Sequence, residues 1–327
     1  MDNGLNKIIG MNMNYVLGDN AVSYFVSYVL DIPLIKHKTL EKTDNNNGQE
    51  IIQPLLLDFV KEIFEDCTIL DYERFYNDRG KFTSKKPKNF HNLYSLYTRG
   101  KTTTEKSYLK QLDKYQQYVS ICGLGPEDSF DKLISKIKES VNKNCIDKQL
   151  LGIQSPQKLS FSDSELPFDL LVSTINLADL IELDSSGKFR KSIIENYSLD
   201  GFNLPRTDKF IYITKLQSAE DIVLAGIYKQ VLATGQPYYR KTYNKNFITY
   251  ECMRNIYNED IEGNPVIDYI ETTQISDNLN VTKLNGIDLI GKFSQWQENT
   301  TLETIYTQCM ELKEFYNNTK NNHKKVL

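Results

Sequence analysis

Histidine is scarce in this sequence, which holds only three in 327 residues. His37, His91 and His323 lie far apart, and none stands at a metal-ligand spacing from another histidine or a cysteine. Zinc and di-iron sites need such clusters, so no metal centre is expected. A Ser-His-Asp hydrolase is also disfavoured, because the chain has no G-x-S-x-G motif and few histidines that could serve as the base.

Cysteine is present without any of its usual functional spacings. The five cysteines form no C-x-x-C motif, and their number is odd. Free, mostly structural thiols in a reducing compartment are the natural interpretation. The widely separated positions are Cys67, Cys122, Cys145, Cys252 and Cys309.

The sequence also lacks a strong charge bias and a long hydrophobic run. Its formal net charge is −4, with acidic and basic residues interspersed, which argues against a general nucleic-acid binder. No apolar stretch approaches the length of a membrane span, and no secretory signal is recognised at the start. We therefore expect a soluble, cytoplasmic protein with a small-molecule substrate as its partner, and no membrane association. The oligomeric state is not evident from the sequence.

What the sequence does contain is a β-turn-α pattern near its start, NYVLGDNAVSYFVSYVL. An apolar run enters Gly18, and a segment of helical character follows it. In a dinucleotide-binding turn, three glycines allow the tight turn, the approach of the pyrophosphate and the close packing of helix on strand. Gly18, Asn20 and Ser23 occupy those positions here, while Asp19 within the turn is unfavourable for an anion. The pattern alone does not separate a binding site from an ordinary strand-helix junction.

A dinucleotide site normally has an acidic residue at the end of the next strand, where it binds the ribose. The strand candidate IPLIKHKT offers Lys36, His37 and Lys38 instead, with Glu41 further on. Two interpretations stay open: an ordinary charged strand end, or recognition of a ribose or phosphate by basic residues.

A second strand-turn-helix lies at the other end, NGIDLIGKFSQWQENTTLETIYTQCMEL. Thr300 and Glu303 have the spacing of a capping box, and an apolar helix is expected from Leu302. The positive end of such a helix suits the pyrimidine edge of a flavin, although a merely well-capped helix gives the same pattern.

Between these ends, the chain mixes helical and strand patterns. Helices are expected over IIQPLLLDFVKEIF and over KSYLKQLDKYQQYVSICGLGPEDSFDKLISKIKESV, the second broken at GLGP. A short strand or a hairpin is expected around Gly80, and LLVSTI is expected to be a buried strand. Further strands are expected over DKFIYITKL, DIVLAGIYKQV and NFITYECMRNI. The fold class is α/β (α+β) in discontinuous domains: 1–66, 126–183 and 284–327 form one, and 67–125 and 184–283 form the other.

In order and character, these segments resemble one family. The stretches VLGDNAVSYFVSYVL, GPEDSFDKLISKIKESV, FDLLVSTINLADLIEL, QPYYRKTYNKNFITYE and GIDLIGKFSQWQENTTLETIYTQCMEL are similar to the flavoprotein superfamily of UDP-galactopyranose mutases, amine oxidases and protoporphyrinogen oxidase-like proteins. The resemblance implies a Rossmann-like FAD/NAD(P)-binding domain with FAD as cofactor, and a second domain with an antiparallel sheet and helices for the substrate.

The resemblance also assigns roles by position. Gly18, Asn20 and Ser23, with Asp19 in the same turn, would approach the FAD diphosphate. Gly291 and Lys292 would lie near the flavin-side phosphate, Lys292 standing where the family has an arginine. The remaining positions would line the isoalloxazine (Trp296, Thr300, Thr301) and the substrate (Tyr239, Arg240, Tyr243, Arg99).

Three function classes follow. The first is an FAD-dependent oxidoreductase or mutase acting on a small polar substrate, such as a nucleotide sugar or an amine, in which the flavin carries the redox chemistry. The second is a non-catalytic relative that keeps the fold without the cofactor, suggested by the two replaced glycines and the missing acid. The third is an NAD(P)- or nucleotide-binding module that reads a phosphate with Lys36–Lys38.

Overall fold

The structure is a computed structural model. It describes residues 13–37, 51–85, 117–154, 157–197, 204, 206–227, 229–252, 254–256, 261, 263–275, 278–297 and 300–324. The chain forms two compact units, each built from separate segments. Unit 1 comprises Met1–Glu41, Ile137–Leu204 and Leu279–Leu327, and unit 2 comprises Lys42–Lys136 and Pro205–Asn278.

These contact units differ from the expected domains in the assignment of 42–66, 126–136, 184–204 and 279–283. The expected division into a cofactor domain and a substrate domain stays a prediction about function. The α/β class itself is confirmed, because unit 1 has a mainly parallel sheet and unit 2 a mainly antiparallel one.

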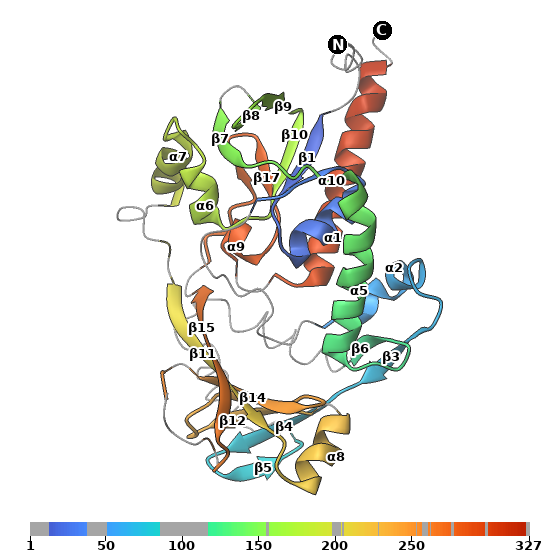
Figure 1. The fold of residues 1–327 in the computed structure, drawn as a ribbon, viewed down its shortest axis with the longest axis vertical. Coiled ribbons are helices and arrows are strands. Elements are labelled where there is room, and N and C mark those ends of the chain that lie inside the picture. Colours follow the sequence, from blue (N-terminus) through green and yellow to red (C-terminus); the bar gives the residue numbers. More distant parts are fainter. Residues whose placement is uncertain are drawn as a thin grey trace. The chain divides into compact units, whose positions relative to one another are not determined.

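The main sheet of unit 1 has five strands in the order β16-β17-β10-β1-β2 (Figure 1). Strands β17, β10, β1 and β2 run parallel, and only β16 runs antiparallel to its neighbour. From β1 the chain goes to β2 on one side, whereas the later strands β10 and β17 lie on the other. Such a reversal of strand order makes a topological switch point, outside whose carboxyl ends open α/β sheets bind ligands. The strands are β1 (Asn14–Leu17), β2 (Leu34–Ile35), β10 (Leu170–Ser173), β16 (Lys283–Leu284) and β17 (Ile287–Leu289).

The strand β10 is buried along its whole length, as expected of LLVSTI. Helix α1 (Ala21–Leu30) connects β1 to β2 and packs against α10 (Leu302–Lys324). Seven of its residues are buried, and Lys313 of α10 donates a hydrogen bond to the Val29 carbonyl at 3.2 Å. The buried faces of α1 explain why its sequence is apolar nearly all round.

Smaller elements complete unit 1. Three antiparallel strands form a separate sheet, and short helices follow β10 and β17. The elements are η2 (Asn142–Asn144), β7 (Leu150–Gln154), β8 (Lys158–Phe161), β9 (Glu165–Pro167), α6 (Leu177–Glu182), α7 (Lys188–Tyr197) and α9 (Lys292–Gln295).

The sheet of unit 2 has seven strands in the order β15-β11-β14-β13-β12-β4-β5. All neighbours are antiparallel except β12 and β4. The hairpin expected at Gly80 is present between β4 and β5. The strands are β4 (Glu73–Asp78), β5 (Lys81–Thr83), β11 (Arg206–Lys215), β12 (Lys229–Thr234), β13 (Arg240–Tyr243), β14 (Phe247–Cys252) and β15 (Val266–Ile275).

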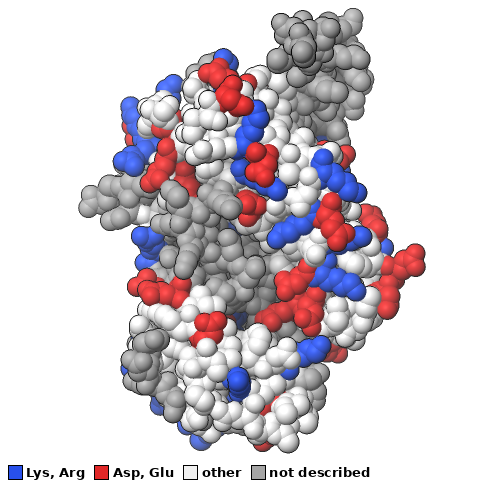
Figure 2. Space-filling view, viewed as in Figure 1, with Lys and Arg blue, Asp and Glu red and all other residues white. Residues whose placement is uncertain are grey.

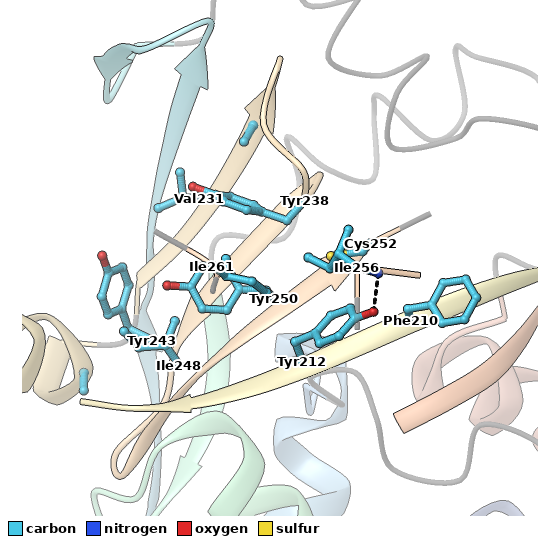
Figure 3. Packing of buried hydrophobic residues seen from close by; sticks show 12 residues of the cluster. Phe210, Tyr212, Val231, Tyr238, Tyr243, Ile248, Tyr250, Cys252, Ile256 and Ile261 are labelled. Carbon is cyan, nitrogen blue, oxygen red and sulfur yellow. Dashed lines mark hydrogen bonds between the residues drawn. The ribbon is translucent and has the colours of Figure 1, made fainter. Parts of the chain in front are cut away.

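Four of the twelve residues in the apolar core cluster of this sheet are tyrosines (Figure 3). Tyr238 meets Tyr250 edge-on, with ring centroids 5.0 Å apart. The fully buried Tyr212 keeps its hydroxyl satisfied, accepting a hydrogen bond from the Ile256 amide at 2.6 Å. Much of the aromatic content of this region is therefore core packing, as tyrosine's preference for strands suggests.

A two-stranded sheet, β3 (Cys67–Asp71) with β6 (Gln117–Ile121), accompanies η1 (Pro54–Leu56), α2 (Leu57–Lys61) and α5 (Pro126–Val141). The boundary between the units falls within α5. The expected apolar stripe on this helix is confirmed: Phe130, Leu133, Ile134 and Ile137 are all buried.

Two element assignments from the sequence are wrong. Gln117–Ile121, expected to be helical, is strand β6, because its β-favouring residues pair with β3. The segment DIVLAGIYKQV, expected to be a strand, lies in helix α8 (Ala219–Ile227) for most of its length, and only its end, from Lys229, belongs to strand β12. The start of α8 is a reciprocal cap, in which the Asp221 amide donates to Ser218 Oγ at 2.9 Å and the Ser218 amide donates to Asp221 Oδ2 at 3.2 Å.

Candidate functional site

The turn between β1 and α1 admits only glycine at position 18. Gly18 has a φ of +151°, and a Cβ atom there would lie 2.3 Å from Ser23 Oγ and 2.5 Å from Thr174 Oγ1. Both distances are far below van der Waals contact. The turn expected from the sequence is thus present, and its single remaining glycine is the one that geometry requires.

Asn20 and Ser23 close the start of α1 by a reciprocal cap. The Ser23 amide donates to Asn20 Oδ1 at 2.9 Å, and the Asn20 amide donates to Ser23 Oγ at 3.1 Å. Within the described residues, no hydrogen bond engages the amides of Ala21 and Val22. Two first-turn N–H groups thus remain for an anion at the positive end of the helix dipole.

The carboxylate of Asp19 is bound to the flank of the helix. Tyr24 donates its hydroxyl hydrogen to Asp19 Oδ1 at 3.0 Å. Burial, together with this carboxylate, raises the pKa of Tyr24. The acidic residue that seemed unfavourable for an anion is therefore tied to a partner one turn along α1.

Thr174, which sequence reasoning did not single out, joins the turn to β10. Its hydroxyl donates to the Leu17 carbonyl at 2.9 Å and lies 2.7 Å from Ser23 Oγ. Asn20 Nδ2 donates to the Thr174 carbonyl at 3.4 Å. Gly18 and Thr174 thus stand together at the carboxyl ends of β1 and β10, which is the switch point of the sheet. The signal in the sequence was the hydroxyl pair at the end of LLVST.

The turn after β17 lies against the first turn of α1. Gly291 has a φ of +110°, and a Cβ atom there would lie 3.3 Å from Val22 Cγ1. The structure thus brings together Gly18 and Gly291, two glycines from opposite ends of the chain, around the first turn of α1. Lys292 begins α9 and holds its ammonium 5.1 Å from the centre of the Phe293 ring.

Trp296 ends α9 in a left-handed conformation and is 1% exposed. Its carbonyl accepts a hydrogen bond from the Leu279 amide at 3.0 Å, and its ring meets Phe293 edge-on at 6.2 Å. In this structure Trp296 is part of the core of unit 1. Its assignment to the isoalloxazine stays a prediction.

Helix α10 begins one residue later than the expected capping box requires. Thr301, not Thr300, is the cap: Thr301 Oγ1 accepts the Thr304 amide at 3.2 Å. Thr300 instead donates its hydroxyl to the Gln297 carbonyl at 3.0 Å. Leu302 as the first helical residue was predicted, but the choice of Thr300 with Glu303 as the reciprocal pair was wrong.

The end of β2 carries basic groups. The His37 amide donates to the Gly18 carbonyl at 3.4 Å, so the β2 end lies beside the turn. Burial lowers the pKa of the His37 imidazole, which favours its neutral form. Lys36 Nζ lies 4.0 Å from Asp147 Oδ2. Lys38 and Glu41 lie outside the described residues.

On the sheet of unit 2, Arg240 is bound to a buried carboxylate. Arg240 forms an ion pair with Glu251 across β13 and β14, and Lys209 Nζ contacts Glu251 Oε2 at 2.9 Å. Tyr239 donates its hydroxyl to the same oxygen at 2.8 Å. Burial opposes the charge on Glu251, but Arg240 and Lys209 outweigh it and lower its pKa to about 2. These four side chains form a buried charged network. Within it, Arg240 is the candidate for binding an anion.

The other candidates on this side differ in placement. Tyr243 is buried in the apolar core, and Lys241 holds its ammonium 4.8 Å from the centre of that ring. Arg99 lies outside the described residues. Arg74, which sequence reasoning did not single out, is buried and donates to Gln230 Oε1 at 3.1 Å.

No protein-family model matches the sequence, and no curated protein matches it either. Solved structures do match. Reduced UDP-galactopyranose mutase superposes with a TM-score of 0.60 at 11% identity, over 94% of this chain and 96% of its own. The chain has the fold of this mutase.

Two further structures support the same architecture. An oxidoreductase from Methanosarcina mazei has a TM-score of 0.55 at 11% identity, covering 92% of this chain and 99% of its own. The tryptophan 5-halogenase MibH has a TM-score of 0.53 at 10% identity, covering 96% of this chain and 67% of its own. The resemblance inferred from the sequence motifs is confirmed for the fold.

The residues at the switch point fit the diphosphate of a dinucleotide. Gly18 lets the turn close tightly against the hydroxyls of Ser23 and Thr174, and the Ala21 and Val22 amides have no hydrogen-bond partner among the described residues. The departures from the glycine fingerprint are compatible with this fit, because Asn20 and Ser23 satisfy each other and Ser23 is fully buried against β10. No group of three or more His, Cys, Asp or Glu side chains that could hold a metal lies within the described ranges.

The surface is mixed in charge. Figure 2 shows acidic and basic side chains interspersed over the visible face. In the part of the chain that the structure describes, no helix combines the length and apolar character needed to cross a membrane.

Proposed function

We propose that this chain binds FAD at the switch point of unit 1 and acts as a flavin-dependent oxidoreductase or mutase on a small polar substrate, such as a nucleotide sugar or an amine. The observation that carries the proposal is the meeting of the Gly18 and Gly291 turns at the first turn of α1. The fold shared with a mutase and an oxidoreductase supports it.

In this proposal, the amides of Ala21 and Val22 bind the diphosphate, and the dipole of α1 adds a favourable potential. Gly18, Asn20 and Ser23 form the tight turn that presents these amides to the diphosphate, while Gly291 and Lys292 approach the flavin side. Trp296, Thr300 and Thr301 shape the turn beside the isoalloxazine. FAD would supply the redox chemistry, and the chain would bind it, orient it and exclude water.

The substrate side is proposed to lie on the sheet of unit 2. Arg240 would bind an anionic group of the substrate while its pairing with Glu251 keeps the guanidinium in place. Tyr239, Tyr243 and Arg99 complete the proposed set. We further propose a cytoplasmic location, which the five free cysteines support.

Ala21→Pro tests the cofactor site without disturbing the helix. Proline lacks the N–H, is well tolerated at the first helical position, and requires extended backbone before it, which Asn20 has (φ −128°, ψ 174°). A lost bond to a charged group costs roughly 1.5–3 kcal/mol, so the affinity for FAD should fall about tenfold or more. Titration of the apoprotein with FAD, followed by flavin absorbance and fluorescence, measures this.

Ala219→Pro is the matched control, because Ala219 is the first residue of α8 in unit 2 and also follows a reciprocal cap. It should leave FAD affinity unchanged. A wild-type protein that purifies colourless and takes up no FAD would reject the proposal in favour of the cofactor-free relative. Equal FAD affinities for the wild type and Ala21→Pro would show that FAD does not bind at the first turn of α1.

A second candidate is an NAD(P)- or nucleotide-binding module. It is favoured by one observation: β2 ends in Lys36 and His37, next to the Gly18 carbonyl, where an acid would bind the ribose of a dinucleotide. Competition between FAD and NADPH separates the two. Tighter binding of NADPH, weakened by Lys36→Gln, would support this candidate.

A further inference from the structure

Asn20 stands at the second glycine position of the dinucleotide turn, where the backbone normally approaches the pyrophosphate. Its backbone is extended, with a φ of −128° and a ψ of 174°. Every residue type adopts this conformation, so the backbone requires neither glycine nor asparagine here. What distinguishes this turn from one with glycine is therefore the Asn20 side chain and its contacts.

The side-chain carbonyl of Asn20 is held against the start of α1. Its Oδ1 accepts a hydrogen bond from the Ser23 amide at 2.9 Å and lies 3.0 Å from Ser23 Oγ. On the other side of the same group, Nδ2 donates to the Thr174 carbonyl at 3.4 Å. These contacts fix the orientation of the side-chain amide, because a flipped group would turn Nδ2 towards the N–H of Ser23, which is also a donor.

The amides of the first helical turn are the groups that bind an anion at a helix start, because they have no partner within the helix. Those of Ala21 and Val22 have no hydrogen-bond partner among the described residues, whereas that of Ser23 donates to Asn20. A phosphate oxygen gains the Ser23 amide only by displacing the Asn20 carbonyl. A diphosphate that leaves Asn20 in place has two amides available instead of three.

We propose that the Asn20 side chain competes with the cofactor diphosphate for the Ser23 amide, and that this competition makes FAD binding weak and reversible. The inference rests on the proposed function, because it concerns the same site. Either way of binding forfeits one hydrogen bond: the bond from the Ser23 amide to a phosphate oxygen, or the existing bond to Asn20. A bond between an amide and a charged group changes affinity by about tenfold or more, so the chain takes up and releases its flavin instead of retaining it.

Two substitutions of Asn20 in the full chain should change FAD affinity in opposite directions. Glycine is a tolerated cap, so Asn20→Gly should keep α1 folded and make the Ser23 amide available. FAD titration should show binding about tenfold tighter, with slower release on dilution. Asn20→Asp keeps a capping oxygen but places a negative charge beside the diphosphate, so it should weaken binding about threefold or more at low salt, and less at high salt.

Ser218→Gly is the matched control for the loss of a cap. Ser218 caps α8 in unit 2 by the same kind of contact, accepting the Asp221 amide at 2.9 Å. Its replacement should leave FAD affinity unchanged, because α8 does not belong to the proposed site. Thermal melts of each variant without FAD verify that the proteins are folded.

The outcomes separate this inference from the proposed function. If Ala21→Pro weakens FAD binding while Asn20→Gly binds FAD no more tightly than the wild type, the site stands and the competition is overturned. That result would show that the Asn20 side chain does not compete with the diphosphate. If neither the wild type nor Asn20→Gly takes up FAD, the proposed function and this inference both fail. Uptake by Asn20→Gly alone would support the competition and show that Asn20 closes the site in the wild type.

Discussion

Ser23 and Thr174 hold their hydroxyl oxygens 2.7 Å apart, although 151 positions separate them in the chain. Ser23 also accepts the Asn20 amide, so one hydroxyl links the turn, the helix and β10. We predict that Ser23→Ala lowers the free energy of unfolding by about 1–2 kcal/mol, the cost of losing a cap and a buried hydrogen bond. Urea denaturation measures this. Ser135→Ala, on an exposed position of α5, should change stability by less than about 0.5 kcal/mol.

Gly18→Ala should be more severe. The new Cβ would approach Ser23 Oγ to 2.3 Å at a φ of +151°, and overpacking with backbone strain costs about 3 kcal/mol. Gly80→Ala isolates the backbone part, because Gly80 has a φ of +86° with nothing within 4 Å of its Cβ position. It should cost about 1 kcal/mol. Similar losses for both variants in thermal melts would contradict the close packing of this turn.

The parts of this site that the sequence revealed are those set by local chemistry. A lone Gly18 between an apolar run and a helical segment predicts the turn, because the constraint lies within six residues. Thr174 and the contact between Gly291 and Val22 depend on which strands become neighbours, and no local pattern carries that information. Their roles emerge only from the strand order β17-β10-β1.

The two elements that the sequence assigned wrongly have different explanations, one a distant strand partner and the other a local helix cap. Gln117–Ile121 is a strand because β3 is its partner 46 positions away, as the contact between Gln117 Nε2 and Asp71 Oδ1 at 2.8 Å shows. The start of α8 was readable locally, since Ser218 and Asp221 have capping-box spacing. The β-favouring residues IVL that follow predict a strand, but the structure forms the helix that this cap begins.

Ser173 is a position where a substitution should stabilise the protein, in contrast to the variants above. Its Oγ is fully buried and has no hydrogen-bond partner among the described residues, while its carbonyl accepts from the Ile290 amide at 3.0 Å and from Ser294 Oγ at 2.8 Å. An unsatisfied buried hydroxyl is unfavourable, so Ser173→Ala should stabilise the apoprotein by about 1 kcal/mol. If the hydroxyl instead serves the proposed cofactor, the same variant should bind FAD more weakly. Denaturation without FAD and FAD titration give the two numbers separately, and destabilisation of the apoprotein would contradict the unsatisfied state.

Glu251 should govern the acid stability of unit 2. Burial raises its pKa, but Arg240 and Lys209 dominate and lower it from 4.5 to about 2. The unfolded chain therefore binds the proton at higher pH than the folded one. The stabilisation is fully present above pH 4.5 and is lost as pH falls towards 2, with a total of about 3 kcal/mol.

Glu251→Gln should flatten this acid limb of the stability curve and cost about 3–5 kcal/mol at pH 7, because Arg240 and Lys209 lose their shared carboxylate. Glu195→Gln, which removes an exposed pair with Lys191 on α7, should change stability by less than about 0.5 kcal/mol. Urea titrations between pH 2 and pH 7 compare the three proteins, and an unchanged acid limb in Glu251→Gln would show that the network does not hold the charge.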